Sequence, residues 1–210
     1  TEALEYQTAI SEVLGVISRS PTDVQPVFEA ILRSAVRLCE GGYGTAIRFD
    51  GELMHLAAGY NHTPDVRQAI QQLLPMRPDR RLMAGRAIQE QAVVQVEDAL
   101  ADPEYSQQVA RAGAFRSMLA VPLMRQGRSV GAIVVNRGRP GPFQKAQIAL
   151  LQAFADQAVI AIENARLFEE VQARTKEVTE ALEQQTATSE ILKVISSTPG
   201  QLEPVFGAIL

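Results

Sequence analysis

FQKAQIALLQAFADQAVIAIENARLFEEVQARTKEVTEALEQQTATSEILKVISST, residues 143–198, is the stretch that decides the architecture of this chain, because it contains neither Gly nor Pro. We expect it to form one continuous helix. At the α-helical rise its 56 residues would extend about 80 Å, farther than a compact domain of this size reaches. The helix is therefore expected to leave the domain.

The two halves of this helix differ in composition. From Ile148 to Phe168 apolar residues recur at spacings of three and four, which predicts a face packed on a core. From Val171 onward the apolar positions thin to Val178, Leu182 and Leu192, on a seven-residue seam that polar residues complete. This pattern predicts a weak coiled coil with a partner helix. A solvated single helix is the alternative.

The bulk composition indicates a soluble globular protein with one sizeable core. The chain has 210 residues, 46% of them hydrophobic and 21% charged, and a net charge of -4. Its one cluster of basic residues is RPDRR at 77–81, and no apolar run reaches the length of a membrane span. We therefore expect neither nucleic acid nor membrane as a partner. A single cysteine, Cys39, fits a reducing cytoplasm and excludes an internal disulfide.

A long internal repeat sets the expected domain boundaries. Residues 1–32 recur as residues 179–210 and match at 21 of 32 positions. The chain is thus expected to be a window on a tandem array. We expect a linker helix at 1–19, a complete module at 20–170, a coiled-coil linker helix at 171–197 and the start of a second module at 198–210.

Within the module, the first half is expected to contain two helices and a hairpin. Thr22 and Gln25 form a capping-box pattern that predicts a helix to about Cys39. Two strands then follow within residues 43–60, joined at Asp50-Gly51. Thr63 before Pro64 predicts the cap of a short helix to about Leu74.

The second half is expected to alternate short helices with strands. After a loop, a short helix is predicted at 86–91 and a strand at 92–98. Asp102-Pro103-Glu104 has the features of a helix start, and that helix should end near Gly113. Strands at 117–124 and 129–136 then form a second hairpin. The whole pattern predicts an α+β fold with an antiparallel sheet and helices at both ends.

Five segments carry a family resemblance, in this order: DALADPEY (98–105), FRSMLAVPL (115–123), VGAIVVNR (130–137), PF (142–143) and FADQAVIAIENARLFEE (154–170). They resemble a GAF domain, specifically those of bacterial sensor histidine kinases. The resemblance implies a six-stranded antiparallel sheet with the terminal helices on one face and a small-molecule pocket on the other. It also implies a signal passed along long terminal helices to an output domain.

The resemblance also implies which residues line the pocket. Tyr60, Ala84 and Arg86 would line it, and the segment with Tyr105 would close it. The family signature of cyclic-nucleotide binders reads here as Asn136-Arg137, Phe143 and Gln147, so the carboxylate that would pair the cation is missing. This departure weakens an assignment to cyclic nucleotides, and the ligand stays an unknown small molecule.

Arg86 and Arg116 are the expected contacts for an anionic ligand, because a guanidinium can bind an anion through two hydrogen bonds. The alternative for such an arginine is a salt bridge to a carboxylate such as Asp98 or Glu97. No cofactor is identified and no metal site is expected. Because His55 and His62 lack a phosphoacceptor context and Cys39 is alone, no catalytic residue is expected in this segment.

Two functions remain open from the sequence. The first is a sensory, regulatory module of a two-component signalling protein, which binds a small molecule and relays a signal through its helical linkers. The second is a dimerisation and relay module without a ligand. The expected partners are a second copy of the chain and neighbouring GAF and kinase domains of the same chain. The expected dimer interface comprises Leu4, Leu14, Ile162, Val171, Val178, Leu182 and Leu192.

Overall fold

The computed structural model describes residues 2–197 and contains six helices and five strands within them. The helices are α1 (Glu2–Arg19), α2 (Gln25–Leu38), α3 (Pro64–Leu73), α4 (Met83–Glu90), α5 (Gln107–Ala112) and α6 (Lys145–Ser197). The strands are β1 (Tyr43–Phe49), β2 (Met54–Tyr60), β3 (Val94–Val96), β4 (Ser117–Arg125) and β5 (Arg128–Arg137). The expected start of a second module, 198–210, lies outside the described residues.

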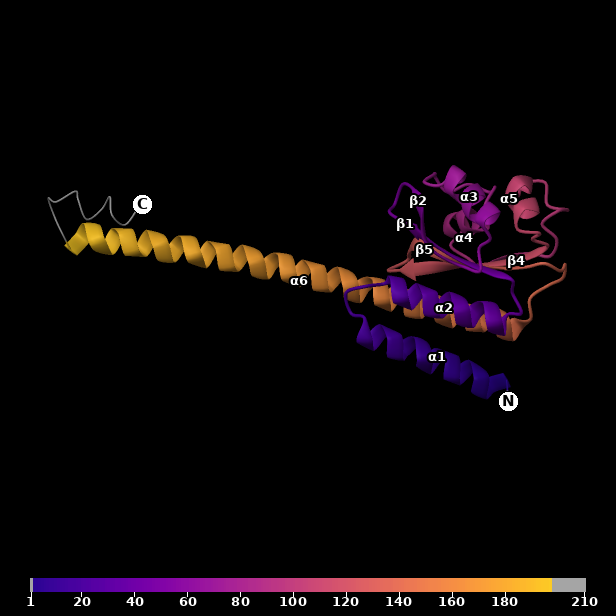
Figure 1. Cartoon of the computed structure of the whole chain (residues 1–210), viewed down its shortest axis with the longest axis horizontal. Helices are drawn as coiled ribbons and strands as arrows, with labels where there is room; N and C mark the ends of the chain where they lie inside the picture. The colour runs from indigo at the N-terminus through magenta and orange to yellow at the C-terminus, as the bar shows by residue number, and fades with distance from the viewer. Residues whose placement is uncertain (1, 198–210) are drawn as a thin grey trace. The chain divides into compact units, whose positions relative to one another are not determined.

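The sheet is antiparallel throughout, in the order β2-β1-β5-β4-β3. Helices α1 and α2 and the first part of α6 lie on one face, and α3, α4 and α5 lie on the other (Figure 1). This arrangement confirms the α+β class. We call the two faces the helix-pair side and the cavity side.

The described residues form five strands. The family resemblance implied six, so that expectation is wrong. A sixth segment contributes only one isolated bridge, between Met76 and Met54 on the edge strand β2. Pro75 and Pro78 flank Met76, and a proline has no N–H to continue a ladder of hydrogen bonds. The five strands that hydrophobic patterning predicted are all present.

Two hydrophobic cores share the sheet, and β5 separates them. Ile133 and Val135 belong to the helix-pair core with Phe154 of α6. Ala132 and Val134, which alternate with them, belong to the cavity-side core. The strand is buried on both faces, which explains its nearly continuous apolar sequence.

The long helix α6 is continuous from Lys145 to Ser197. Its part up to Ala165 belongs to the first compact unit, residues 1–165, where Leu151, Phe154 and Ala158 are fully buried. The second unit comprises residues 166–210, and its described side chains from 166 to 190 are all exposed. None of the helices among the described residues is long and apolar enough to span a membrane.

Several other differences from expectation concern helix starts, and β3 is shorter than the strand expected at 92–98. Thr63 caps α3 as predicted, since its hydroxyl accepts a hydrogen bond from Val66 N. At α2 the capping box is wrong: Asp23 Oδ1, not Thr22, accepts from Gln25 N at 2.9 Å. Helix α4 begins at Met83, three residues before the predicted start.

Helix α5, in contrast, begins later than predicted, at Gln107 with Ser106 as its cap, and it ends at Ala112, directly before the expected Gly113. The acceptor at Asp102 is used differently. Asp102 Oδ1 accepts from Glu104 N and Tyr105 N within a turn, and its carboxylate also pairs with Arg86.

Candidate functional site

A small cavity lies between the sheet and the helices of the cavity side. Its volume is about 40 Å³, enough for a few water molecules, whereas sites for drug-sized ligands have roughly 300–1,000 Å³. Most of its wall is apolar. The lining residues are Thr45, Ile47, Ile70, Leu74, Leu82, Met83, Ala84, Tyr105, Val109, Phe115, Val134 and Asn136.

Asn136 is the polar group of the cavity that lacks a hydrogen-bond partner. Its side chain comes from the end of β5, is 3% exposed, and has an Oδ1 atom without a partner among the described residues. A buried acceptor left unpaired costs about 1–3 kcal/mol. A donor N–H or O–H of a bound molecule would remove this cost.

Thr45, the second polar residue of the wall, is already paired. Its Oγ1 lies 2.9 Å from Nε2 of His62. Burial lowers the pKa of His62 below the usual 6.5, which favours the neutral ring. The ring therefore holds the Thr45 hydroxyl without bringing a positive charge to the cavity.

A buried ion pair joins two segments of the cavity side. Arg86 of α4 bonds Asp102 through both terminal nitrogens, at 2.5 and 3.1 Å, and its Nε donates to Arg80 O at 2.7 Å. The two side chains are 4% and 15% exposed. The guanidinium thereby ties α4 to the loop at 99–106, which we call the Asp102 loop.

The backbone around Gly85 brings the loop at 75–82 close enough for this contact. A Cβ atom at Gly85 would lie 2.1 Å from Asp79 O, so any other residue would collide with the loop. Arg80 adds ion pairs to Glu90 and to Glu104 of the Asp102 loop. Three segments are thus joined above the cavity.

The electrostatics of the pair favour the ionised carboxylate. The Arg86 guanidinium, through its hydrogen bonds, holds the pKa of Asp102 below its usual 3.8. Three residues after Asp102, Tyr105 is 5% exposed and lines the cavity, and burial raises the pKa of its hydroxyl. The Asp102 loop therefore contributes a neutral phenol to the wall.

A second buried arginine connects β5 to the helix-pair side. Arg137, next to Asn136, donates to Cys39 O at 2.9 Å, to Pro142 O at 3.3 Å and to Gln147 Oε1 at 2.6 Å. Its guanidinium lies 3.7 Å from the centre of the Phe143 ring. Of the signature residues, Arg137, Phe143 and Gln147 therefore form one cluster, which we call the Arg137 clamp. It joins the end of β5 to the end of α2 and to α6.

Gln147 replaces the missing carboxylate with an amide oxygen. The described acceptors of Arg137 are all neutral, and burial lowers the pKa of its guanidinium. The stacked ring of Phe143 provides the remaining favourable contact with the cation. This geometry gives Arg137, Phe143 and Gln147 a structural role, because they contact one another.

The residues expected to contact a ligand lie in different places. Ala84 and Tyr105 line the cavity. Arg86 is paired with Asp102, so a salt bridge was the better interpretation, although with a different partner from the expected Asp98 or Glu97. Arg116 pairs with Asp98 through Nε and Nη2 at 2.9 and 2.7 Å. Neither arginine is among the residues that line the cavity.

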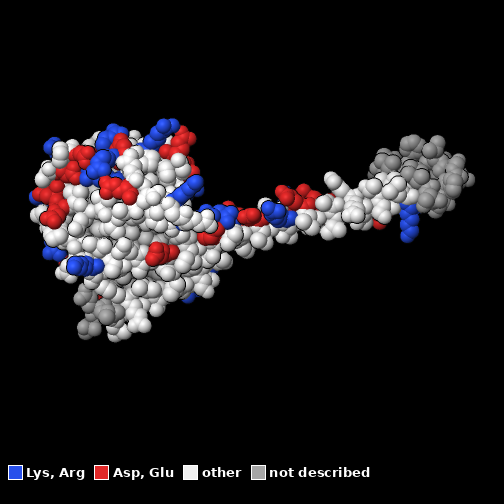
Figure 2. Space-filling model, turned by 180° about the vertical axis from the view of Figure 1, so that it is seen from behind, with Lys and Arg blue, Asp and Glu red and all other residues white. Residues whose placement is uncertain are grey.

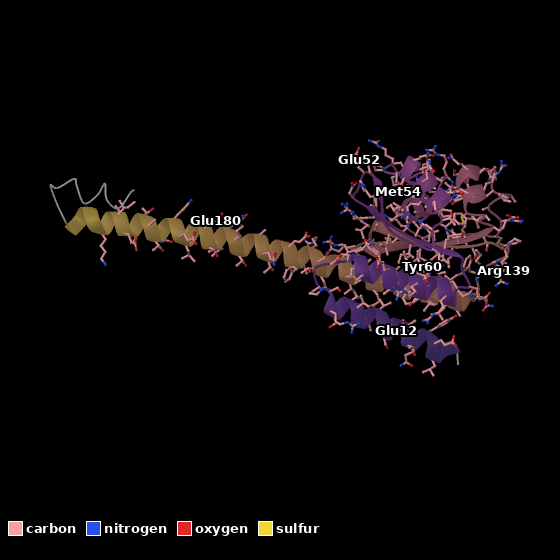
Figure 3. The ribbon with its side chains drawn as sticks, viewed as in Figure 1. Glu12, Glu52, Met54, Tyr60, Arg139 and Glu180 are labelled. Atoms are coloured by element: carbon pink, nitrogen blue, oxygen red, sulfur yellow. The ribbon has the colours of Figure 1, made fainter. Side chains whose placement is uncertain are left out.

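Tyr60 lies on the opposite face of the sheet from the cavity. A bulge in β2 pairs Ala46 with Ala58 and Ile47 with Leu56, so Ala57 is the extra residue. Beyond it the alternation of faces is reversed. Tyr60 consequently packs on the helix-pair side, where α2 lies, and Figure 3 labels it at the end of β2.

Sequence reasoning missed most of the cavity wall, including Thr45, Phe115 and Val134. For the strand residues a signal was available, since Val134 and Asn136 alternate with the helix-pair residues Ile133 and Val135. For Phe115 there was none, because it precedes β4 and is placed by the loop before it.

The remaining residues weighed from the sequence have structural contacts. Cys39 is fully buried, burial raises the pKa of its thiol to about 12, and the thiol lies 3.9 Å from Gln147 O. Within residues 2–197 no group of His, Cys, Asp and Glu side chains is arranged to hold a metal ion. Arg77, Arg80 and Arg81 of the basic cluster each pair with a carboxylate. On the face in Figure 2, charges of both signs are interspersed.

Comparison with known proteins identifies one family. The model for the GAF domain matches residues 23–162. A search of curated proteins finds no match.

Solved structures with the same fold come from proteins of several kinds. The GAF domain of an Acinetobacter phosphoenolpyruvate-protein phosphotransferase is 16% identical, with a TM-score of 0.64 over 79% of this chain and 97% of that one. The free methionine-R-sulfoxide reductase of Neisseria meningitidis is 18% identical, with a TM-score of 0.63 over 77% and 90%.

A domain of a two-component sensor histidine kinase protein from Sinorhizobium meliloti 1021 is 18% identical, with a TM-score of 0.57 over 71% of this chain and 97% of that one. At these identities the likeness establishes the fold and leaves the parent protein undetermined.

Proposed function

Because this chain belongs to the family of GAF domains, which are small-molecule-binding and regulatory modules, we propose that it is the sensory module of a signalling protein. In this proposal a small molecule binds on the cavity side and changes the terminal helices, which pass the change to an output domain. The observation that carries the proposal is Asn136, a buried and unpartnered acceptor facing an apolar cavity.

The end of β5 supplies a physical route from the cavity to the helices. Asn136 faces the cavity, and the next residue, Arg137, holds both Cys39 O after α2 and Gln147 of α6. A ligand that moves Asn136 must therefore strain the Arg137 clamp or move it. The ligand can shift the balance of two states only as far as it binds them unequally, about 1.4 kcal/mol for each tenfold change.

The chemistry of the wall selects the class of ligand. We propose a compact, largely apolar molecule with one N–H or O–H group that donates to Asn136 Oδ1. A volume of about 40 Å³ does not admit such a molecule, so binding requires movement of the wall. We propose that the Asp102 loop is the segment that moves, because it carries Tyr105 of the wall, and that its pair with Arg86 opposes this movement.

Replacing Asn136 with leucine is the test of the ligand site. The swap keeps the size of the side chain and removes the unpaired acceptor, so the melting temperature should stay the same or rise. Any molecule that native mass spectrometry finds on the wild-type protein purified from its source should be absent from the variant. Its stabilising effect in thermal unfolding should vanish as well. Retained binding by Asn136→Leu would rule out this site.

The size of the cavity favours a second candidate function, a relay module without a ligand. In that case the side chains of the wall fill the space permanently, and the module transmits motion between its neighbours. The Asn136→Leu variant separates the two functions. If the module is a relay, the variant should leave the output activity of the full-length protein unchanged. If the module is a sensor, the variant should lose only the response of that activity to the ligand.

We further propose that the module works as a parallel homodimer through its terminal helices. Support comes from apolar side chains that remain exposed in one chain: Leu4, Leu14, Val171, Val178, Leu182 and Leu192 are 46–65% exposed. Ile162 of the expected interface differs, because it already packs partly against the helix-pair core. An exposed apolar row on a helix is best covered by a second such helix.

Leu182→Asp should weaken this dimer. A charge in an apolar seam loses its hydration without gaining a partner, so we expect the dissociation constant to rise by at least about tenfold. Sedimentation equilibrium of the 210-residue chain is the measurement, with Gln184→Asp, off the seam, as the matched control. A wild-type chain that is monomeric at tens of micromolar would contradict the proposed dimer.

As the output domain we propose a histidine kinase. The support is the likeness of the five segments to GAF domains of that class, together with the shared fold of the Sinorhizobium meliloti domain. Under this proposal the segment itself is regulatory and catalysis resides elsewhere in the protein. Phosphotransfer assays on the full-length protein, with the Asn136→Leu variant alongside, address both points.

A further inference from the structure

Helix α1, which belongs to the first copy of the internal repeat, has two apolar faces. One face of α1 packs into the helix-pair core through Ala9, Val13 and Ile17, which are 0%, 0% and 8% exposed. The other face carries Leu4 and Leu14, which are 65% and 46% exposed. The same short helix therefore has an apolar face used within the module and an apolar face left outside it.

The end of α6 repeats both faces. Ala187, Ile191 and Ile195 stand where Ala9, Val13 and Ile17 stand in the first copy, and Leu182 and Leu192 repeat Leu4 and Leu14. In the described part of α6, Ala187 is exposed and Ile191 partly exposed. Ala9 and Val13 are thus buried in the first copy, whereas their described counterparts Ala187 and Ile191 are exposed and partly exposed.

The local structure of the two copies agrees where both are described. Thr8 Oγ1 donates to Leu4 O at 2.8 Å, and Thr186 Oγ1 donates to Leu182 O at the same distance. Leu182 and Leu192 are 57% and 59% exposed, similar to their counterparts in α1.

The surface that covers α1 is also repeated. Helix α2 contributes Val27, Phe28, Ile31 and Leu32 to the same buried cluster as α1, and Glu12 pairs with Arg37 of α2 at 3.9 Å. All four apolar residues recur unchanged, as Val205, Phe206, Ile209 and Leu210. These four lie outside the described residues, at the start of the following module.

We propose that the face of α6 formed by Ala187, Ile191 and Ile195 docks on the segment that starts at Glu203, as α1 packs on α2. Leu182 and Leu192 are then left for the second copy of the chain. One helix would in this way belong to two cores, to this module through residues 148–165 and to the next through residues 187–195. The inference concerns the connection between modules and stands whether or not a ligand binds.

The proposal differs measurably from a simple coiled coil along the whole linker. The seven-residue seam contains Leu182 and Leu192 but excludes Ile191. Neighbouring residues on a helix point about 100° apart, so a charge at 191 and a charge at 192 reach different surfaces. The two positions therefore form a matched pair for substitution, with the same location in the linker and nearly the same helix propensity.

The experiment compares Ile191→Asp with Leu192→Asp in the full-length protein. We expect Ile191→Asp to lower the melting temperature of the following module by roughly 5–10 °C and to leave the dimer intact. Leu192→Asp should weaken the dimer at least about tenfold and leave that melting temperature unchanged. Calorimetry and sedimentation equilibrium are the two readouts.

The first copy supplies the reference for these effects. Val13 is fully buried and Leu14 is 46% exposed, so Val13→Asp should destabilise this module and Leu14→Asp should not. If Ile191→Asp prevents folding, hydrogen exchange of Ile191→Ala is the substitute. It should speed exchange in residues 205–210 at least about tenfold relative to the wild type. The proposal would be overturned if substitutions at residue 191 changed neither the melting temperature nor the hydrogen exchange of the following module. It would also be overturned if substitutions at 191 and 192 weakened the dimer equally.

Discussion

Replacing Asp102 with asparagine will lower the free energy of unfolding by about 2–4 kcal/mol at neutral pH. The substitution keeps the shape of the side chain and its acceptor oxygen, but it removes the charge that compensates the buried Arg86. That guanidinium is 4% exposed and has Arg80 O as its other acceptor. Chemical denaturation with urea is the measurement, because the midpoint and the slope are obtained separately.

The contribution of the Arg86–Asp102 pair to the free energy of unfolding should disappear at acid pH. Because the pKa of Asp102 is lower in the folded protein than its usual 3.8, the unfolded chain binds a proton more readily. The stabilisation is therefore complete above the unfolded pKa and is lost as the pH falls through the folded pKa. The difference between wild type and Asp102→Asn should be constant from about pH 5 to 8 and shrink below about pH 4.

The exposed pair of Asp98 and Arg116 is the matched control. It is also bidentate, although through Nε and Nη2 of the arginine, and it has a similar turn, since Asp98 Oδ1 accepts from Leu100 N, but its side chains are 29% and 37% exposed. Asp98→Asn should therefore change stability far less than Asp102→Asn. Arg86→Met added to Asp102→Asn should recover part of the loss, because it removes the unpaired charge. Equal effects of Asp98→Asn and Asp102→Asn would show that burial does not decide the strength of these pairs.

These two pairs also show what the sequence could not predict about the site. The presence of Asp98, Asp102, Arg86 and Arg116 was plain, and Asp98 was correctly considered as the alternative partner of an arginine. Which arginine takes which carboxylate depends on where the Asp102 loop lies, and a loop leaves no periodic signal. The later start of α5 has the same cause. Asp102 does not cap that helix, because its carboxylate pairs with Arg86 and accepts the hydrogen bonds of its own turn.

The strands were predictable because patterning and turn residues agreed at each of them. The side of the sheet on which each residue of β2 packs was not predictable, because a single extra residue, Ala57, reverses the alternation beyond it. Strict alternation from Met54 would have placed Tyr60 on the cavity side. The bulge carries it to the other core, and only the register with β1 reveals this.

The signature residues illustrate the opposite case, in which the sequence indicated a cluster and the structure supplies its role. The absence of a carboxylate at position 147 suggested an unpaired cation. Instead Gln147 Oε1 accepts from both Arg137 and Gln144 N, so one amide joins β5 to the first turn of α6. In the proposed relay, a movement at Asn136 would pass through this amide to the beginning of the long helix, whose far end repeats the sequence that enters this module.

The phase of that helix, more than its length, should carry the signal. Every residue removed rotates the remainder by about 100°, so a deletion of four residues leaves a phase change of about 40°, whereas a deletion of seven leaves about 20° in the opposite sense. The exposed apolar residues Val171 and Leu192, which lie 21 residues apart, also remain a whole number of seven-residue repeats apart only in the second case. A four-residue deletion must therefore misalign the seam.

We expect deletion of Thr175–Val178 in the full-length protein to abolish the response of the output domain, and deletion of Thr175–Ala181 largely to preserve it. The longer deletion is the control for the shorter one, since it removes more helix and more contacts. Output activity with and without the natural stimulus is the measurement, and sedimentation equilibrium establishes that both variants remain dimers. If neither deletion changes the response, the linker is a passive tether. If the seven-residue deletion is the more harmful, length decides, because a rotating relay tolerates lost length better than lost phase.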